Sequence, residues 1–367
     1  MNTQKATRFA PIAIAALIAT TGLLVAGPLN PPAGPITSTG KTTQEIFDKV
    51  GSSEPRIPIS AATTPGDANS IYRITLPGSY YLTGNITGVV GKHGIEVAAN
   101  DVTIDLNGFV LAGVAGMGAF DGITSSVASL RGTHISNGTI RDWGGEGIDL
   151  FTFSSNDSSV KNVVVRQNAS HGIYMDDSCV IQDCNVDLNG GNGIFPDSGA
   201  IVERCTSSNN TLHGISIGGG TVRRCRVGSN DSSGIRSANF STIEECESSN
   251  NGVDGIIAGN MSVVRGNICS GNGVVSATGA GIHVTGVGNH IEDNRCITAD
   301  RGILVDAAAN TIIKNVCIAN TVDWIIAANN IYGPIVDRRA AATAFVNGFS
   351  AASTMGSTDT NANYSVQ

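Results

Sequence analysis

Three consecutive segments decide the fold: GIFPDSGAIVERCTSSNNTLH (193–213), GISIGGGTVRRCRVGSNDSS (214–233) and GIRSANFSTIEECESSNNGVD (234–254). Each starts with Gly-Ile, carries Val or Ile eight or nine residues later, Cys three residues after that, and Asn five residues further on. No apolar piece is long enough for a helix, and the segment is too short for a four-stranded propeller blade. The segments therefore predict three short strands per repeat, with bends at Gly and Asn.

The Gly-Ile pair recurs along most of the chain, at glycine spacings of 20 to 28 residues. Its ten glycines are Gly94, Gly122, Gly147, Gly172, Gly193, Gly214, Gly234, Gly255, Gly281 and Gly302. Stacking repeats of this kind produces a parallel β-helix, in which each residue lies about 4.8 Å above its counterpart in the previous turn. The sequence therefore predicts a β-solenoid of about ten turns.

A column of charged residues supports this register. The residues that follow the second apolar position of each repeat alternate in sign over consecutive turns, as Glu203, Arg223, Glu244, Arg265 and Glu292. Like charges directly opposite each other would destabilise a sheet, whereas alternating charges fit in-register stacking. We interpret this face as structural and not as a binding patch.

These features resemble the right-handed parallel β-helix proteins of the pectin-lyase-like superfamily. The resemblance covers roughly residues 60–330 and depends on the Gly-Ile-x-Val strand starts and on an internal Cys/Asn column. It implies an all-β, right-handed parallel β-helix of about ten to eleven turns with capped ends. It also implies lyases, hydrolases and epimerases of acidic polysaccharides, together with members that lack demonstrated catalysis.

Composition excludes several other classes of protein. The chain has 367 residues, of which 46 are Gly, and its formal net charge is −8. A hydrophobic content of 41% is enough to bury a core, which excludes wholesale disorder. The glycines follow no three-residue period, which excludes collagen. The negative charge argues against nucleic acid as a partner.

The first residues are typical of a secretory signal. Lys5 and Arg8 precede an uncharged stretch over residues 9–27, which ends in small residues. An uncleaved membrane anchor is the alternative, since nineteen residues could just span a bilayer. We predict an exported protein that is periplasmic, at the cell surface or extracellular and that contacts the membrane only through the export signal.

The predicted organisation has four parts. They are a signal peptide over residues 1–27, a Pro-rich linker over 28–58 with a short helix at 42–50, the β-helix over 59–330, and a C-terminal cap or tail over 331–367.

All eight cysteines fall within the repeats. An exported protein with an even number of cysteines usually suggests disulfides. Here, however, Cys184, Cys205, Cys225 and Cys246 would stack in one inner column with parallel Cβ vectors, a geometry that disulfides do not favour. We therefore expect free buried thiols, and we expect no zinc site because the sequence has no CxxC pair.

Candidate functional residues lie at the outward positions of the Gly-Ile strand. The candidate catalytic residues are Asp149, Asp176, Asp197 and Arg236, and the candidate substrate-binding residues are Phe151, Tyr174, Phe195 and His283. Aromatic faces beside carboxylates suit a sugar ring, because the ring can stack its apolar face and hydrogen-bond at its edge.

Three functions remain open at this stage. The first is binding of a polysaccharide or cell-surface glycan through the Gly-Ile strand. The second is a Ca²⁺-dependent polysaccharide lyase or a glycoside hydrolase that acts on an acidic glycan through Asp149, Asp176, Asp197 and Arg236. The third is a structural or adhesive surface protein. The repeats are short and regular, and this scarcity of long loops favours binding over catalysis.

Binding of a glycan requires no cofactor, and Ca²⁺ is expected only if the protein is a polysaccharide lyase. His93, His171 and His213 share the column just before the glycine, but Asn192 separates the last two. We therefore predict no metal site among the histidines.

Overall fold

The computed structural model describes residues 42–43, 45, 54–151, 157–273, 278–337, 346–347 and 359–366. The chain divides into two units, Met1–Ser53 and Glu54–Gln367. In the first unit the Thr42 N–H donates to Glu45 Oε2 at 2.8 Å, and the Glu45 N–H donates to Thr42 Oγ1 at 3.1 Å. This reciprocal pair is the capping box that starts a helix.

Most of the expected helix at 42–50 and the whole predicted signal segment lie outside the described residues. Within the described part of the chain, no helix has the length and apolar character needed to cross a membrane.

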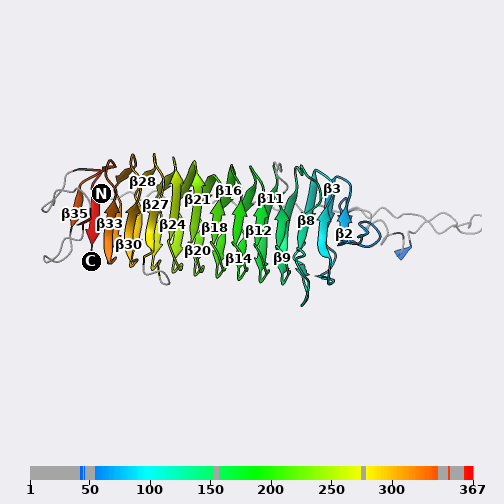
Figure 1. Ribbon diagram of the computed structural model, residues 1–367. Helices are drawn as coiled ribbons and strands as arrows, with labels where there is room; N and C mark the ends of the chain where they lie inside the picture. Colours follow the sequence, from blue (N-terminus) through cyan, green and yellow to red (C-terminus); the bar gives the residue numbers. More distant parts are fainter. Residues whose placement is uncertain are drawn as a thin grey trace, which may run out of the picture. The chain divides into compact units, whose positions relative to one another are not determined.

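The second unit is a stack of coils, each of which contributes one strand to a parallel sheet that we call the Gly-Ile sheet (Figure 1). Its thirteen strands are β2 (Ser70–Ile74), β5 (His93–Val97), β8 (Ile123–Ser125), β10 (Ile148–Leu150), β12 (Ile173–Met175), β15 (Ile194–Pro196), β18 (Ile215–Ile217), β21 (Ile235–Asn239), β24 (Ile256–Asn260), β27 (Ala280–Val284), β30 (Arg301–Val305), β33 (Val322–Ile326) and β36 (Val346–Asn347). The isoleucines of the repeat pair with one another from coil to coil, which confirms the predicted register.

The remaining strands form a second sheet, to which most coils contribute two strands. Its strands are β1 (Ile57–Pro58), β3 (Gly78–Tyr81), β4 (Ile86–Thr87), β6 (Val102–Asp105), β7 (Val110–Ala112), β9 (His134–Arg141), β11 (Ser159–Arg166), β13 (Val180–Gln182), β14 (Asn185–Asp187), β16 (Ala200–Glu203), β17 (Thr206–Ser208), β19 (Gly220–Arg223), β20 (Arg226–Gly228), β22 (Ser241–Glu244), β23 (Glu247–Ser249), β25 (Val263–Arg265), β26 (Ile268–Ser270), β28 (His290–Glu292), β29 (Arg295–Ile297), β31 (Thr311–Ile313), β32 (Val316–Ile318), β34 (Ile331–Tyr332), β35 (Ile335–Asp337) and β37 (Asn363–Val366).

The predicted count of ten to eleven turns is wrong, because the Gly-Ile sheet has thirteen strands. The additional strands carry no Gly-Ile pair: β2 places Tyr72 beside Ile95, β33 places Trp324 beside Ile303, and β36 places Val346 beside Trp324. Counting glycines therefore missed the coils at the two ends of the stack.

Glycine is needed in the interior coils because the strand packs closely against the third side of its own coil. A Cβ atom on Gly214 would lie 2.3 Å from Val227 Cγ1 and 2.6 Å from Asn230 Nδ2. No side chain fits at these distances.

Buried asparagines hold one corner of each coil to the next. The Asn210 side chain donates from Nδ2 to Asn230 Oδ1 at 3.0 Å, and the Asn210 N–H donates to the same oxygen at 3.0 Å. Asn230 repeats both contacts with Asn251. The positive φ that turns the corner belongs to the residue before each buried Asn, as at Asn209 and Ser229, and not to the buried Asn itself as the sequence had suggested.

All eight cysteines are buried, and none of them forms a disulfide. Four of them occupy an equivalent corner. Cys184, Cys205, Cys225 and Cys246 fill the column that Asn267 continues, and the Cys246 N–H donates to Asn267 Oδ1 at 2.9 Å. The thiols therefore take the place of asparagines in a hydrogen-bonded ladder.

The alternating charges pair on the second sheet as the sequence predicts. Glu203 lies beside Arg223 and Glu244 beside Arg265, with closest N–O distances of 2.5 and 2.6 Å. On the outer face of this sheet, these glutamates and arginines therefore pair with one another between successive coils.

Candidate functional site

Three aromatic rings stack on the outer face of the Gly-Ile sheet. Phe151 and Tyr174 lie 4.5 Å apart between ring centroids at an interplanar angle of 8°, and Tyr174 and Phe195 lie 5.0 Å apart at 10°. The strand register places Tyr174 directly beside Phe195, so the ring spacing follows the spacing of the coils. The rings cover one another's inner faces, and the face of Phe195 that is turned away from Tyr174 borders the next coil.

Beyond Phe195 the next coil provides only a small residue in the same column. Ser216 follows Phe195, and Arg236 follows Ser216. The gap between ring and guanidinium forms a cavity of about 180 Å³, which we call the slot. Its lining residues are Phe151, Tyr174, Phe195, Asp197, Ser216, Ile217, Gly218, Arg236 and Ala238.

Arg236 gives the slot a positive charge. Its side chain is exposed, and within the described part of the chain it makes no ion pair. On the second sheet, by contrast, Arg223, Arg224 and Arg265 are each paired with a glutamate. An unpaired guanidinium beside an aromatic face is suited to an anionic group on a ligand.

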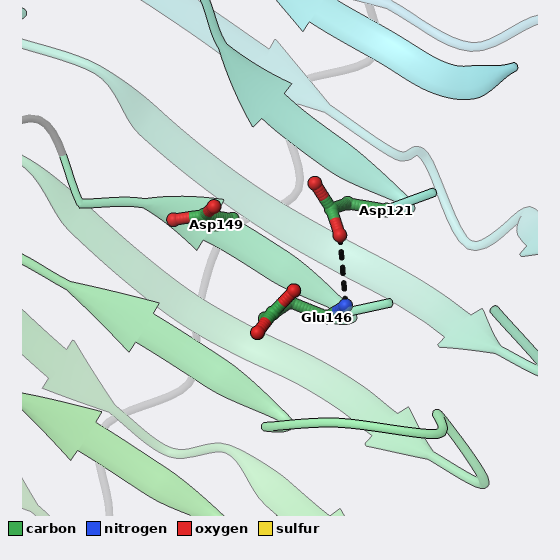
Figure 2. Close-up of side chains that lie close together, drawn as sticks. All are labelled: Asp121, Glu146 and Asp149. Atoms are coloured by element: carbon green, nitrogen blue, oxygen red, sulfur yellow. Dashed lines mark hydrogen bonds between the residues drawn. The ribbon is translucent and has the colours of Figure 1, made fainter. Parts of the chain in front are cut away.

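Three carboxylates gather on two adjacent coils next to the aromatic stack (Figure 2). Asp121 and Glu146 come directly before β8 and β10 in the chain, and Asp149 lies on β10. One ligand oxygen from each lies within 4.8 Å of the others. The Glu146 N–H donates to Asp121 Oδ1 at 2.8 Å, and the Phe151 N–H donates to Asp149 Oδ1 at 3.0 Å.

We call Asp121, Glu146 and Asp149 the acidic cluster, and burial changes the acidity of two of its members, Glu146 and Asp149. Burial raises the pKa of Glu146 to about 7; the Ser170 hydroxyl, which donates to Glu146 Oε1 at 2.7 Å, opposes the rise, and a hydrogen bond with Asp121 adds to it. Burial also raises the pKa of Asp149 to about 6. Near neutral pH the cluster can therefore both accept and donate protons.

Comparison with known proteins places this fold. A family model described as "Right handed beta helix region" matches residues 77–222. The chain is similar to the A-module of the mannuronan C-5 epimerase AlgE4 from Azotobacter vinelandii, at 14% identity and a TM-score of 0.63, over 78% of this chain and 94% of that one. The chain has the fold of a right-handed β-helix.

Two further solved structures match this β-helix protein with lower scores. The Dettilon tailspike protein (gp208) has 12% identity and a TM-score of 0.43, over 78% of this chain and 61% of the tailspike. Pectate lyase Pel9A has 14% identity and a TM-score of 0.32, over 69% of this chain and 64% of the lyase. No curated protein sequence matches the chain.

The predicted site residues do not form one site in the β-helix protein. Asp197 and Arg236 line the slot with the three aromatic residues, whereas Asp149 belongs to the acidic cluster. Asp176 is buried and lies with Asp177 and Asp197 in a second group of three carboxylates.

His283 lies apart from the slot. Its Nδ1 is 3.2 Å from Asp254 Oδ2, and its Nε2 is 2.8 Å from Asp306 Oδ2. Both ring nitrogens thus have carboxylate partners within the β-helix itself.

Asp121 and Glu146 are not among the predicted site residues, because they lie before the glycine and not at the outward positions that follow it. Both residues directly precede a Gly-Ile pair, in the column that also holds His93 and His171. Lining up this column against the outward position of Asp149 would have revealed three acids on two adjacent coils.

Both groups of carboxylates have the donor type that hard cations prefer. Ca²⁺ binds six to eight oxygen ligands, of which carboxylates are the commonest in proteins. Asp121, Glu146 and Asp149 provide three such groups, so the donor set fits Ca²⁺ in type. Bound Ca²⁺ would require all three to be ionised, and it would therefore compete with protons on Glu146 and Asp149.

The acidic cluster predicts an unusual pH dependence of stability. Because the pKa of Glu146 is raised from 4.5 to about 7 in the folded state, the folded protein binds more protons than the unfolded chain between these values, and stability falls as pH rises through this window. Glu146→Gln should therefore be more stable than wild type at pH 8, by about 1 kcal/mol after allowance for solvent screening, and the gain should shrink towards pH 5.

Urea unfolding at the two pH values measures this difference. Asp231→Asn, which alters an exposed carboxylate, serves as the control and should change little at either pH. Equal stability of Glu146→Gln and wild type at pH 8 would contradict the raised pKa.

Proposed function

We propose that this protein binds an acidic glycan and that the slot between Phe195 and Arg236 holds one of its sugar units. The observation that carries the proposal is the slot itself, in which a free aromatic face and an unpaired guanidinium lie on either side of a small residue. The Cα positions of Phe195 and Arg236 are two coils apart, roughly 10 Å, which leaves space for a single ring between the side chains.

The two walls of the slot recognise different parts of such a sugar. The Phe195 ring offers a stacking surface to the apolar face of a pyranose. Arg236 can form a bidentate pair with a carboxylate at the edge of the same ring. A uronate unit has both features, which is why we propose an acidic glycan and not a neutral one.

The proposal includes export of the protein, because its glycan ligand would be met outside the cytoplasm. It is supported by the basic Lys5 and Arg8 and by the uncharged stretch over residues 9–27. The epimerase with the similar fold is named for its action on mannuronan, and this makes mannuronan a reasonable first probe.

Arg236 should dominate affinity for an acidic glycan. In titrations with mannuronan and polygalacturonate fragments at low salt, we expect Arg236→Gln to weaken binding by at least about tenfold, since it removes a charge-assisted contact. Ser216→Phe should abolish binding, because its ring would continue the aromatic stack and fill the slot.

Arg224→Gln is the matched control, since Arg224 pairs with Glu245 on the second sheet. Its affinity should equal that of the wild type. Undiminished binding by both Arg236→Gln and Ser216→Phe would refute the slot as the binding site, and absence of any binding by wild type would leave the structural or adhesive function in its place.

A second candidate function is proton-transfer catalysis on the bound glycan. The specific observation in its favour is the pair of raised pKa values at Glu146 and Asp149, which burial brings close to neutrality. One ligand oxygen of Glu146 lies within 4.8 Å of one of Asp149, so the two carboxyl groups can act as an acid and a base in a lyase-type proton abstraction.

If the cluster is catalytic, activity requires Glu146 protonated and Asp149 ionised. The rate should then pass through a maximum between about pH 6 and pH 7, as set by the two pKa values. We expect Glu146→Gln and Asp149→Asn each to lose at least about a hundredfold in turnover of a uronate polymer, with binding retained. Ultraviolet absorbance of unsaturated sugar ends, measured with and without Ca²⁺, monitors the reaction.

Wild-type protein that binds the polymer but leaves it intact at every pH would eliminate the catalytic function and keep the binding function. Turnover that survives in both variants would show that other residues carry the chemistry.

A further inference from the structure

One coil of the β-helix is shorter than its neighbours. The spacing from Gly214 to Gly234 is 20 residues, whereas the spacings immediately before and after it are 21. The register shows where the residue is missing, because Ala200, Gly220 and Ser241 are direct partners on β16, β19 and β22. The deletion therefore falls at the corner between the Gly-Ile sheet and the second sheet, which we call the first corner.

The shortened coil is also bare of large side chains on its outer surface. From the slot to the first corner, its outward positions are Ser216 and Gly218. Gly219 and Gly220 complete the corner, and Gly220 lies in the inward column of Ala200 and Ser241. Gly220 has a φ of +126°, so this corner is turned without the extra residue that the neighbouring coils place there, Gly199 at +72° and Phe240 at +52°. Gly219 is buried although it has no side chain. The coil is thus recessed between its two neighbours.

Those neighbours form the walls of a groove. On one side the wall continues from Phe195 through Asp197, and on the other it continues from Arg236 through Ala238. Asp197 lies close enough that a Cβ atom on Gly218 would be 2.6 Å from its Oδ1. The slot is therefore one end of a depression that follows the shortened coil from Ser216 towards the first corner. This direction is perpendicular to the direction in which the coils stack.

Phe240 lies at the outer end of this depression. It occupies the first corner of the coil that carries Arg236, at a φ of +52° and with 70% of its surface exposed. A bulky side chain in this backbone region is uncommon and strained. Exposing so large an apolar ring also forgoes the free energy that its burial would provide. The ring differs from those of Phe151, Tyr174 and Phe195 because no other aromatic ring in the described part of the chain covers it.

We infer that the bound glycan follows the shortened coil along the depression from Ser216 to Gly220 and that Phe240 is a second stacking platform for it. This inference depends on the proposed function, since it assigns the path of the same glycan. The four residue steps along the coil span roughly 13 Å, so the chain extends beyond the single sugar held in the slot. The sugar units of the glycan beyond the slot pass over the first corner and away from the Gly-Ile sheet.

The test compares short and long ligands in two glycine variants. Phe240→Gly removes the platform, and Gly suits this corner because Gly199 and Gly288 occupy the equivalent position in other coils at positive φ. Met261→Gly is the matched control: Met261 lies at the first corner of the next coil, at a φ of +53° and 56% exposed.

The probes are mannuronate and galacturonate oligosaccharides of two and six units, with affinity measured by calorimetry. For the hexasaccharide that binds wild type, we expect Phe240→Gly to weaken binding by about tenfold and Met261→Gly to leave it unchanged. The disaccharide, which fits the slot alone, should bind both variants as it binds wild type.

Each other result overturns the inference. If a hexasaccharide binds wild type and Phe240→Gly with equal affinity, the path towards Phe240 is wrong, and the slot remains as the proposed binding site. An equal loss in Met261→Gly would show a general effect on the corner. If neither hexasaccharide binds wild type, the proposed function fails, and the path fails with it.

Discussion

The β-helix depends on hydrogen bonds between buried asparagines of successive coils, which hold each coil in a fixed register with the next. One Asn oxygen accepts from both the side chain and the backbone N–H of its neighbour, as Asn230 does for Asn210. Each of these groups is buried, and a buried amide without a partner would be costly. A slip of one residue would break every contact in the ladder. The same register applies to the outer faces of the sheets, so equivalent side chains of successive coils lie directly beside one another in columns.

The candidate site is a consequence of those columns. Aromatic residues at the same position in successive coils form a stack of rings. The small Ser216 leaves a slot between Phe195 and Arg236, and the missing residue of the same coil leaves a recess at Gly219. At the other end of the stack, acids on adjacent coils are forced together, and burial raises the pKa of Glu146 and Asp149. The slot and the acidic cluster thus lie on the same face because of repetition with small local exceptions.

Much of this arrangement could be predicted from the residues. The period of Gly-Ile, Cys and Asn specified the fold and the register, and the register brought Tyr174 next to Phe195. The terminal coils escaped prediction because Tyr72 and Trp324 stand where other coils have Ile. Asp121 and Glu146 escaped prediction because they precede the Gly-Ile pair, in a column that also contains histidines, and not at the outward positions after the glycine. The spacing of 20 residues was visible in the sequence, but only the strand pairing assigns the missing residue to the first corner.

We propose the shortened coil as the centre of glycan recognition. A crystal structure of the protein with a hexasaccharide from the uronate polymer that it binds tests this claim most directly. We expect density for one sugar between Phe195 and Arg236, with the next units over Gly218 and towards Phe240. Density that runs along the stack of coils, or that lies on the second sheet, would contradict it.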